Sequence, residues 1–389
     1  MSYSSAVSLL ATELYSTHGG VQAYMRRLAE ILSEYNVGRG KGLDCVSLLD
    51  AEPVYARHSG AVAYRTFEGS RGSKARFAGQ ALRAGYRTRP CLTVVGHTGL
   101  TPVASLLKRA RLTRSYVVVL HGVEAWKKLD WGDRTACRDA ASVVSTTRFT
   151  ADEFCRHNGI SPAKIRIIPL AIADSLIEEN TAAEQSRAEG RLKVLTVTRM
   201  TTIDSYKGVD TLIDSVAEAR ARSVDIELKI VGAGDEVPIL KRRAAERHVD
   251  DAVVFTGPVS DEELERFYRD CDVFALPSKG EGFGIVFLEA MRYGKPCIGG
   301  NHGGTPEVIE PGVTGFLVDY GDVAALTRHF TDLAANPARR LSMGASALKA
   351  LSSRYLFPRM QADWFSVLDE QAGNDHSMTA VTSMDLRRA

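Results

Sequence analysis

The chain has 389 residues, of which 44% are hydrophobic and 25% charged, and its formal net charge is +2. This composition is typical of a soluble globular protein, and the length suffices for two domains that each bury a core. No apolar run reaches about 18 residues and no basic segment precedes an apolar core, so neither a transmembrane helix nor a secretory signal is expected. The six cysteines show no Cys-x-x-Cys spacing, which argues against a zinc site or a disulfide framework and fits a cytoplasmic location.

The first half of the chain alternates short apolar, β-branched runs with longer amphipathic stretches, the pattern of parallel sheets built from βα units. The clearest helix is 21–35, where Tyr24, Leu28, Ile31 and Leu32 share one face. Strands are expected at residues 6–12, 44–50, 91–97, 116–122, 142–147 and 165–171. These elements predict an N-terminal Rossmann-like domain over residues 1–173.

The second half repeats this pattern after a polar, acidic stretch at 174–190, which is the predicted hinge. A C-terminal Rossmann-like domain is predicted over 191–355, a helix that returns to the N-terminal domain over 356–372 with a helix break at Pro358, and a disordered tail over 373–389. Strands are expected at 192–199, 226–234, 251–257, 272–278, 295–301 and 315–319, and helices near 208–222, 235–248, 261–270, 284–293, 305–309 and 322–334.

Charge is unevenly distributed, because residues 69–123 contain no Asp or Glu. One interpretation is a set of solvated helix faces. The other is a basic face that meets anionic lipid or a phosphate-bearing substrate. The cations of this window are Arg71, Lys74, Arg76, Arg83, Arg87, Arg89, Lys108, Arg109, Arg111 and Arg114.

Two glutamates, Glu281 and Glu289, stand eight positions apart in "PSKGEGFGIVFLEAM". The first follows a predicted buried strand, and ligands of open α/β sheets sit beyond the carboxyl ends of strands. The second lies inside the following helix, whose side chains lean back towards its start. Glycines Gly282 and Gly284 before that helix allow backbone amides to approach a ligand closely. Both carboxylates are therefore expected to converge on a ligand that carries hydroxyls and phosphate.

Cations and further glycine turns suit the same ligand. Arg199 ends a strand and Lys207 precedes a helix, an arrangement that fits a diphosphate. Gly19 and Gly20 form a second glycine turn, and His121 ends the strand before "GVE". The stretch "IVGAGDEV" begins like a dinucleotide fingerprint, but Val237 occupies the third glycine position, which is weak evidence for a dehydrogenase.

Together these motifs resemble the retaining family-4 glycosyltransferases of the GT-B fold. The resemblance covers about residues 5–340 and rests on Gly19-Gly20, "HGVE", "IRIIPLAI", Arg199 with Lys207-Gly208, "IVGAGD", the Glu-x7-Glu segment and "GGTPEVIEPGVTGFLV". It implies an α/β protein with two Rossmann-like, doubly wound parallel-sheet domains facing a cleft, the N-terminal one (1–173) on the acceptor side and the C-terminal one (191–355) binding the nucleotide sugar. It also implies transfer of a hexosyl group from a GDP- or UDP-linked sugar to a hydroxyl, with retained anomeric configuration.

The same resemblance implies roles for individual residues. His121, Arg199, Lys207 and Glu281 are the expected catalytic set: Glu281 and His121 beside the donor sugar, the two cations on the departing diphosphate. The expected donor-binding residues are Gly19, Gly20, Gly282, Phe283, Gly284 and Glu289, the last on the ribose. No metal or other cofactor is expected, because cations and helix ends stabilise the leaving charge. The expected acceptor is a lipid-linked or polysaccharide intermediate of exopolysaccharide synthesis, and a basic face at 69–123 would let the protein reach it from the inner face of the membrane. No nucleic-acid partner is expected.

Other classes remain open at this point. A glycoside hydrolase also uses two carboxylates but has no need for phosphate-binding cations. A nucleotide-sugar epimerase on the same fold would interconvert the donor without an acceptor, and a non-catalytic module would only bind it.

Overall fold

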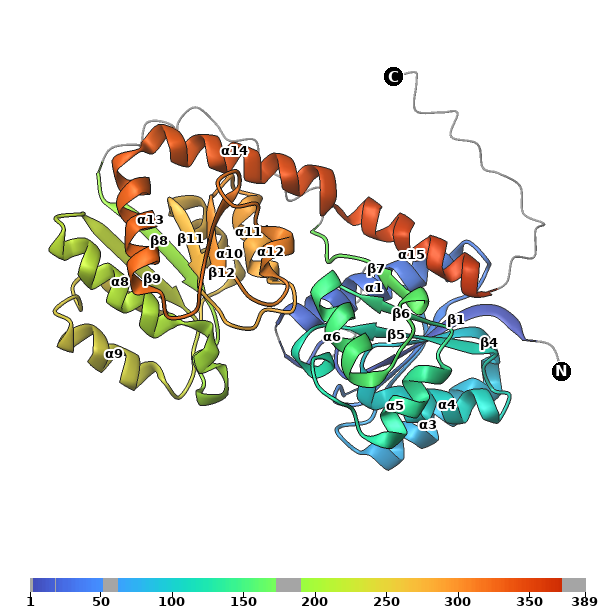
Figure 1. Cartoon of the computed structure of the whole chain (residues 1–389). Coiled ribbons are helices and arrows are strands. Elements are labelled where there is room, and N and C mark those ends of the chain that lie inside the picture. The colour runs from blue at the N-terminus through green and yellow to red at the C-terminus, as the bar shows by residue number, and fades with distance from the viewer. Residues whose placement is uncertain (1–2, 18, 52–61, 173–189, 373–389) are drawn as a thin grey trace, which may run out of the picture.

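The computed structural model describes residues 3–17, 19–51, 62–172 and 190–372, and contains two α/β domains that lie side by side (Figure 1). Each domain is built on one parallel sheet, seven-stranded in the first and six-stranded in the second over the described residues. Both sheets carry helices between successive strands. This confirms the predicted fold class of two doubly wound domains.

The N-terminal sheet has the strand order β3-β2-β1-β4-β5-β6-β7. The strands between its two edges are largely buried, as expected for a parallel sheet covered on both faces. The strands are β1 (Ser4–Ala11), β2 (Leu43–Ser47), β3 (Tyr64–Gly69), β4 (Pro90–Val95), β5 (Ser115–Leu120), β6 (Ser142–Ser145) and β7 (Ile165–Ile167). The helices are α1 (Gly20–Val37), α3 (Lys74–Thr88), α4 (Thr101–Arg109), α5 (Trp131–Asp139) and α6 (Arg148–Asn158).

The C-terminal sheet has the order β10-β9-β8-β11-β12-β13, so the chain reverses direction across the sheet between β8 and β11. Ligands of doubly wound sheets bind at such a switch point, beyond the carboxyl ends of the strands. The strands are β8 (Leu192–Val197), β9 (Ile226–Val231), β10 (Val253–Gly257), β11 (Val273–Leu276), β12 (Cys297–Gly300) and β13 (Gly315–Val318). The helices are α8 (Val209–Ala221), α9 (Val237–Glu246), α10 (Asp261–Asp270), α11 (Ile285–Met291), α12 (Thr305–Val308), α13 (Val323–Ala335), α14 (Pro337–Arg354) and α15 (Phe357–Ala372).

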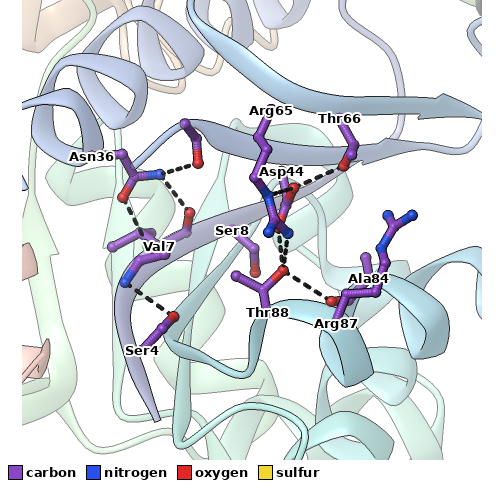
Figure 2. Close-up of polar contacts among 12 residues, drawn as sticks. Ser4, Val7, Ser8, Asn36, Asp44, Arg65, Thr66, Ala84, Arg87 and Thr88 are labelled. Carbon is purple, nitrogen blue, oxygen red and sulfur yellow. Dashed lines mark hydrogen bonds and ion pairs between the residues drawn. The ribbon is translucent and has the colours of Figure 1, made fainter. Parts of the chain in front are cut away.

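Strand β3 at the edge of the first sheet was not predicted from the sequence. Its alternating polar residues lack a continuous apolar run, and a buried carboxylate on β2 holds it instead (Figure 2). Asp44 is 2% exposed and accepts hydrogen bonds from Arg65 Nε (2.9 Å) and Thr66 Oγ1 (2.8 Å) on β3. Thr88, at the end of α3, donates to the same carboxylate. These hydrogen bonds compensate the Asp44 carboxylate for the hydration that it loses on burial.

Helices α14 and α15 pass along the C-terminal domain and then over the N-terminal domain (Figure 1). The helix break falls at residues 355–356, and Pro358 lies in the first turn of α15, where proline is tolerated. Trp364 Nε1 of α15 donates to Tyr24 Oη of α1 at 3.1 Å, so this helix packs on the N-terminal domain. The chain crosses between domains near Ile172 and Leu356, which form a parallel bridge. The predicted hinge, apart from Gly190, and the predicted tail lie outside the described residues.

Candidate donor-sugar site at the domain junction

Glu281 lies where the sequence predicted, beyond the carboxyl end of β11. Its carboxylate accepts a hydrogen bond from Lys207 Nζ at 2.6 Å, and the two side chains are 12% and 15% exposed. Its backbone carbonyl accepts from Gly304 N at 2.7 Å, which connects the turn after β11 to the turn after β12. The position and the ion pair give a charged, partly dehydrated group at the switch point of the sheet.

Lys207 reaches this carboxylate because the start of α8 packs closely on the turn after β11. Lys207 ends a 3₁₀ turn, and the next residue, Gly208, has a left-handed φ of 74°. A Cβ on Gly208 would lie 2.7 Å from the carbonyl oxygen of Pro277, so glycine is needed for both conformation and space. Burial, the largest single cause, lowers the pKa of Lys207, but Glu281 together with Tyr206 and Asp204 outweighs it and the pKa is raised. The ammonium is therefore charged at neutral pH.

Arg199 does not share these contacts. Its guanidinium donates to Asp204 at 3.1 Å, and its side chain is 74% exposed. It borders a cavity of about 390 Å³ whose lining includes Tyr320 but neither Lys207 nor Glu281. The predicted pair of cations thus has two hydrogen-bonded carboxylate partners, Asp204 for Arg199 and Glu281 for Lys207.

The segment after Glu281 leads into α11 through Gly284, whose φ is 87°. The ring of Phe283 is buried and packs edge-on against Tyr355 at 5.8 Å between centroids, so a donor contact there falls to its backbone. Helix α11 has only seven residues. Glu289 on this helix accepts from Tyr268 Oη at 2.8 Å. Burial raises the pKa of Glu289, while the hydrogen bond from Tyr268 acts in the opposite direction.

His121, at the end of β5, is buried at 8% exposure. Its Nε2 lies 2.9 Å from the carbonyl of Gly96; because a carbonyl only accepts, Nε2 carries the proton. The ring also stands edge-on to Tyr24, with 5.3 Å between centroids. Burial lowers the pKa of His121 despite the opposing Glu124 carboxylate, so the ring is neutral at pH 7 and its Nδ1 is an acceptor.

The two domains meet at these residues. A Cβ on Gly282 would lie 2.2 Å from the carbonyl oxygen of His121, and one on Gly20 would lie 3.3 Å from Ile285 at the start of α11. Thr147 Oγ1 donates to the carbonyl of Gly282 at 3.0 Å. The structure therefore brings His121, the turn at Gly19–Gly20 and the segment from Glu281 to Gly284 to one junction, whereas Arg199 contacts Asp204 beyond it.

Some contacts were not visible in the sequence. Asp204 lies in the 3₁₀ turn that ends at Lys207, five positions after Arg199, but no motif marked it as a partner. Tyr268 and Thr147 come from other elements, and a single sequence carries no signal for their proximity. Within the described residues, no group of three or more His, Cys, Asp and Glu side chains is arranged to hold a metal ion. No helix in the described ranges is both long and apolar enough to cross a membrane.

Comparison with known proteins agrees with this geometry. Residues 18–176 match the family described as Glycosyltransferase Family 4, and residues 178–350 match the one described as Glycosyl transferases group 1. A GDP-mannose-dependent alpha-(1-6)-phosphatidylinositol monomannoside mannosyltransferase of Mycolicibacterium smegmatis is 35% identical over 63% of this chain and 68% of its own length. The chain belongs to the family-4 glycosyltransferases of the GT-B fold.

Further relatives of this glycosyltransferase are more distant. A D-inositol 3-phosphate glycosyltransferase of Pseudarthrobacter chlorophenolicus is 31% identical over 58% of this chain and 56% of its own length. Among solved structures, Anabaena Alr3699/HepE in complex with UDP has a TM-score of 0.78 at 18% identity, covering 94% of this chain and all of that one. Sucrose-phosphate synthase from Thermosynechococcus elongatus has a TM-score of 0.76 at 20% identity, covering 94% and 98%. These structural likenesses establish the fold.

Proposed function

We propose that this glycosyltransferase moves a hexosyl group from a nucleotide diphosphate sugar to a lipid-linked hydroxyl, with retention and without a metal. The observation that carries the proposal is the Lys207–Glu281 pair at the switch point of the second sheet, next to His121 of the first domain. A paired cation and carboxylate there suit a ligand with phosphate at one end and sugar hydroxyls at the other.

In the proposed mechanism, negative charge grows on the leaving β-phosphate and Lys207 stabilises it. Arg199 adds a second cation after exchanging Asp204 for phosphate. Fixed charges aimed at developing charge lower the barrier because they need no reorganisation during the reaction. Glu281 accepts from donor-sugar hydroxyls and Glu289 from the ribose. The acceptor attacks from the same face that the diphosphate leaves, and its proton passes to the leaving phosphate oxygen, which gives retention without a protein nucleophile.

GDP-mannose is the donor we propose first, because the mycobacterial relative is named for its dependence on it. UDP-linked hexoses are the alternative, since phosphate and ribose contacts do not discriminate between bases. The acceptor we propose is an inositol lipid or a polyprenyl-linked intermediate of exopolysaccharide synthesis, reached from the cytoplasmic side as a peripheral membrane protein.

The basic window supports a lipid-bound acceptor. On α3, Arg76, Arg83 and Arg87 share one face at spacings of seven and four residues, and all three are exposed. Tyr86 beside them is 70% exposed, and Leu106 on α4 is 46% exposed. Exposed cations with interspersed apolar groups are typical of surfaces that meet anionic lipid.

Vesicle binding tests this face. The protein should cosediment with phosphatidylglycerol vesicles at low ionic strength and be released by salt. Arg83→Ala should weaken binding about fivefold, since each basic residue near an anionic surface contributes about 1 kcal/mol. Arg242→Ala, an exposed cation on α9 of the other domain, is the matched control and should bind as the unaltered protein does. Equal binding to phosphatidylcholine vesicles would reject an electrostatic membrane face.

Arg199→Ala should lower kcat/KM about 30-fold, equivalent to about 2 kcal/mol, which is less than the loss typical of one preorganised charge-stabilising group. The smaller loss is expected because Arg199 is highly exposed and must exchange Asp204 for phosphate. Initial rates of nucleoside diphosphate release measure the effect. Arg222→Ala, an exposed cation after α8, is the control. Unchanged turnover would remove Arg199 from the site.

A donor and acceptor screen tests the function itself. Nucleoside diphosphate release should require both GDP-mannose, or one UDP-hexose, and a lipid-linked acceptor, and should persist in EDTA. Proton NMR of the product should show the donor's anomeric configuration. Conversion of the donor without acceptor would indicate an epimerase. Binding of the donor with no turnover would indicate a binding module. Release of sugar from an unactivated glycoside would indicate a hydrolase.

A further inference from the structure

Glu307, in the short helix α12 of the C-terminal domain, makes contacts that the proposed chemistry does not use. Its carboxylate oxygens accept from the backbone N–H groups of Arg148 and Phe149, both at 2.8 Å. Those groups belong to the first turn of α6 in the N-terminal domain. A carboxylate at a helix start satisfies N–H groups that have no partner inside the helix and matches the local positive potential.

The remaining N–H groups of that helix start are bonded within the N-terminal domain. Thr147 caps the helix through its Oγ1, which accepts from Thr150 N at 3.3 Å, and its carbonyl accepts from Ala151 N at 3.2 Å. The first two N–H groups therefore depend on a residue of the other domain. Separating the domains would leave Arg148 N and Phe149 N to water and Glu307 without these partners.

The backbone of Glu307 is held at the place where the chain crosses between domains. Its carbonyl accepts from Tyr355 Oη and from Arg354 Nη2, both at 2.9 Å. Tyr355 is hydrogen-bonded through its own carbonyl to Ile172 N at 2.9 Å, and its ring packs on Phe283. One residue thus connects the crossing segments to the surface of the N-terminal domain.

The turn that Glu307 grips also touches both halves of the candidate site. Thr146 Oγ1 donates to the carbonyl of His121 at 3.5 Å, and Thr147 Oγ1 donates to the carbonyl of Gly282 at 3.0 Å. Movement of this turn relative to α12 would therefore change the spacing between His121 and Glu281–Gly282. Catalytic groups contributed by two domains act together only when that spacing is maintained.

We propose that Glu307 is a positioning residue that ties α6 to the domain crossing and so sets the closed arrangement in which His121 and Glu281 meet the donor sugar. The proposal rests on the function proposed above for that site. Nucleotide affinity should depend little on this tie, because the side chains assigned to the nucleotide, Lys207 and Glu289, come from the C-terminal domain and the N-terminal domain adds only the backbone turn at Gly19–Gly20. Turnover should depend on it strongly, because His121 comes from the N-terminal domain.

The full-length variants Glu307→Ala and Glu307→Gln test this contact between α12 and α6. The control is Glu310→Ala, which removes an exposed carboxylate three residues away. Glu307→Ala should lower kcat about tenfold, because modest misplacement of reacting groups is costly, and change the dissociation constant of the nucleoside diphosphate less than about threefold. Small-angle X-ray scattering should show a larger radius of gyration than for the unaltered protein. Glu307→Gln keeps one acceptor oxygen, so its kcat and radius of gyration should lie between those of Glu307→Ala and the unaltered protein.

The outcomes are separable. The positioning role of Glu307 would be rejected if Glu307→Ala kept the wild-type kcat, or if Glu310→Ala lost as much activity. It would also be rejected if Glu307→Ala lost kcat but kept an unchanged scattering profile. If the unaltered protein transfers no sugar from any donor, the proposed function fails. The scattering comparison alone then tests whether Glu307 holds the domains together. A larger radius of gyration in Glu307→Ala but not in Glu310→Ala would still support that role.

Discussion

Replacing Lys207 by methionine should lower kcat/KM about 300-fold, or about 3.4 kcal/mol, the range found when one preorganised charge-stabilising group is removed. Methionine keeps much of the length and the apolar stem of lysine but removes the ammonium that lies 2.6 Å from Glu281. The effect should exceed that of Arg199→Ala, because the Lys207 side chain is 15% exposed and water substitutes for it poorly. Initial-rate kinetics at varied donor concentration measures the change.

Loss of the ion pair itself must be separated from loss of the phosphate contact, because an unpaired buried carboxylate also destabilises the protein. The double variant Lys207→Met/Glu281→Gln removes that unpaired charge, and its thermal stability should recover while its activity should not. Lys279→Met, an exposed lysine two residues before Glu281, should be unaffected. A kcat/KM within about threefold of wild type for Lys207→Met would exclude contact with the leaving diphosphate, given the loss expected for such a group.

The sequence predicted the fold where local pattern and topology agree. Strand β11 was recognisable as a short apolar run ending in Pro277-Ser278, and the rule that ligands sit beyond strand ends placed Glu281 correctly. The same reasoning correctly placed Lys207 before a helix through the following glycine. Strand β3 was missed because an edge strand held by Asp44 needs no continuous apolar pattern.

What the sequence did not show is which surfaces meet. Arg199 and Lys207 were predicted to act together on a diphosphate, and the structure adds that Asp204 pairs with the first and Glu281 with the second. Phe283, a predicted donor contact, packs its ring against Tyr355, a partner that no motif indicated. The contact of Thr147 with Gly282 crosses between the domains and depends on the angle at which the two units meet, which no periodicity or motif within either unit specifies.

Gly282 shows how closely the two domains must approach, and Gly282→Ala should lower kcat about 100-fold. The added Cβ would lie 2.2 Å from the carbonyl oxygen of His121 and 2.8 Å from Cα of Gly122, both backbone atoms that cannot rotate away. The φ of Gly282 is not left-handed, so alanine fits the local backbone and the cost arises only at the junction. Displacing His121 from Glu281 by about 1 Å is sufficient for a loss of this size.

Gly132→Ala is the matched control, because Gly132 lies in α5 with no atom within 4 Å of a built Cβ. It should keep wild-type kcat and gain a little stability, since alanine is favoured over glycine in a helix.

The nucleoside diphosphate should bind Gly282→Ala with nearly unchanged affinity, because Lys207 and Glu289 stay within one domain. The thermal transition of this variant should shift by only a few degrees. Full activity in Gly282→Ala would show that transfer does not require the close junction between His121 and Gly282. If the loss of activity is accompanied by a large loss of thermal stability, Gly282 is required for folding instead. A role at the domain junction is supported only if the variant loses activity while it stays folded and still binds the nucleotide.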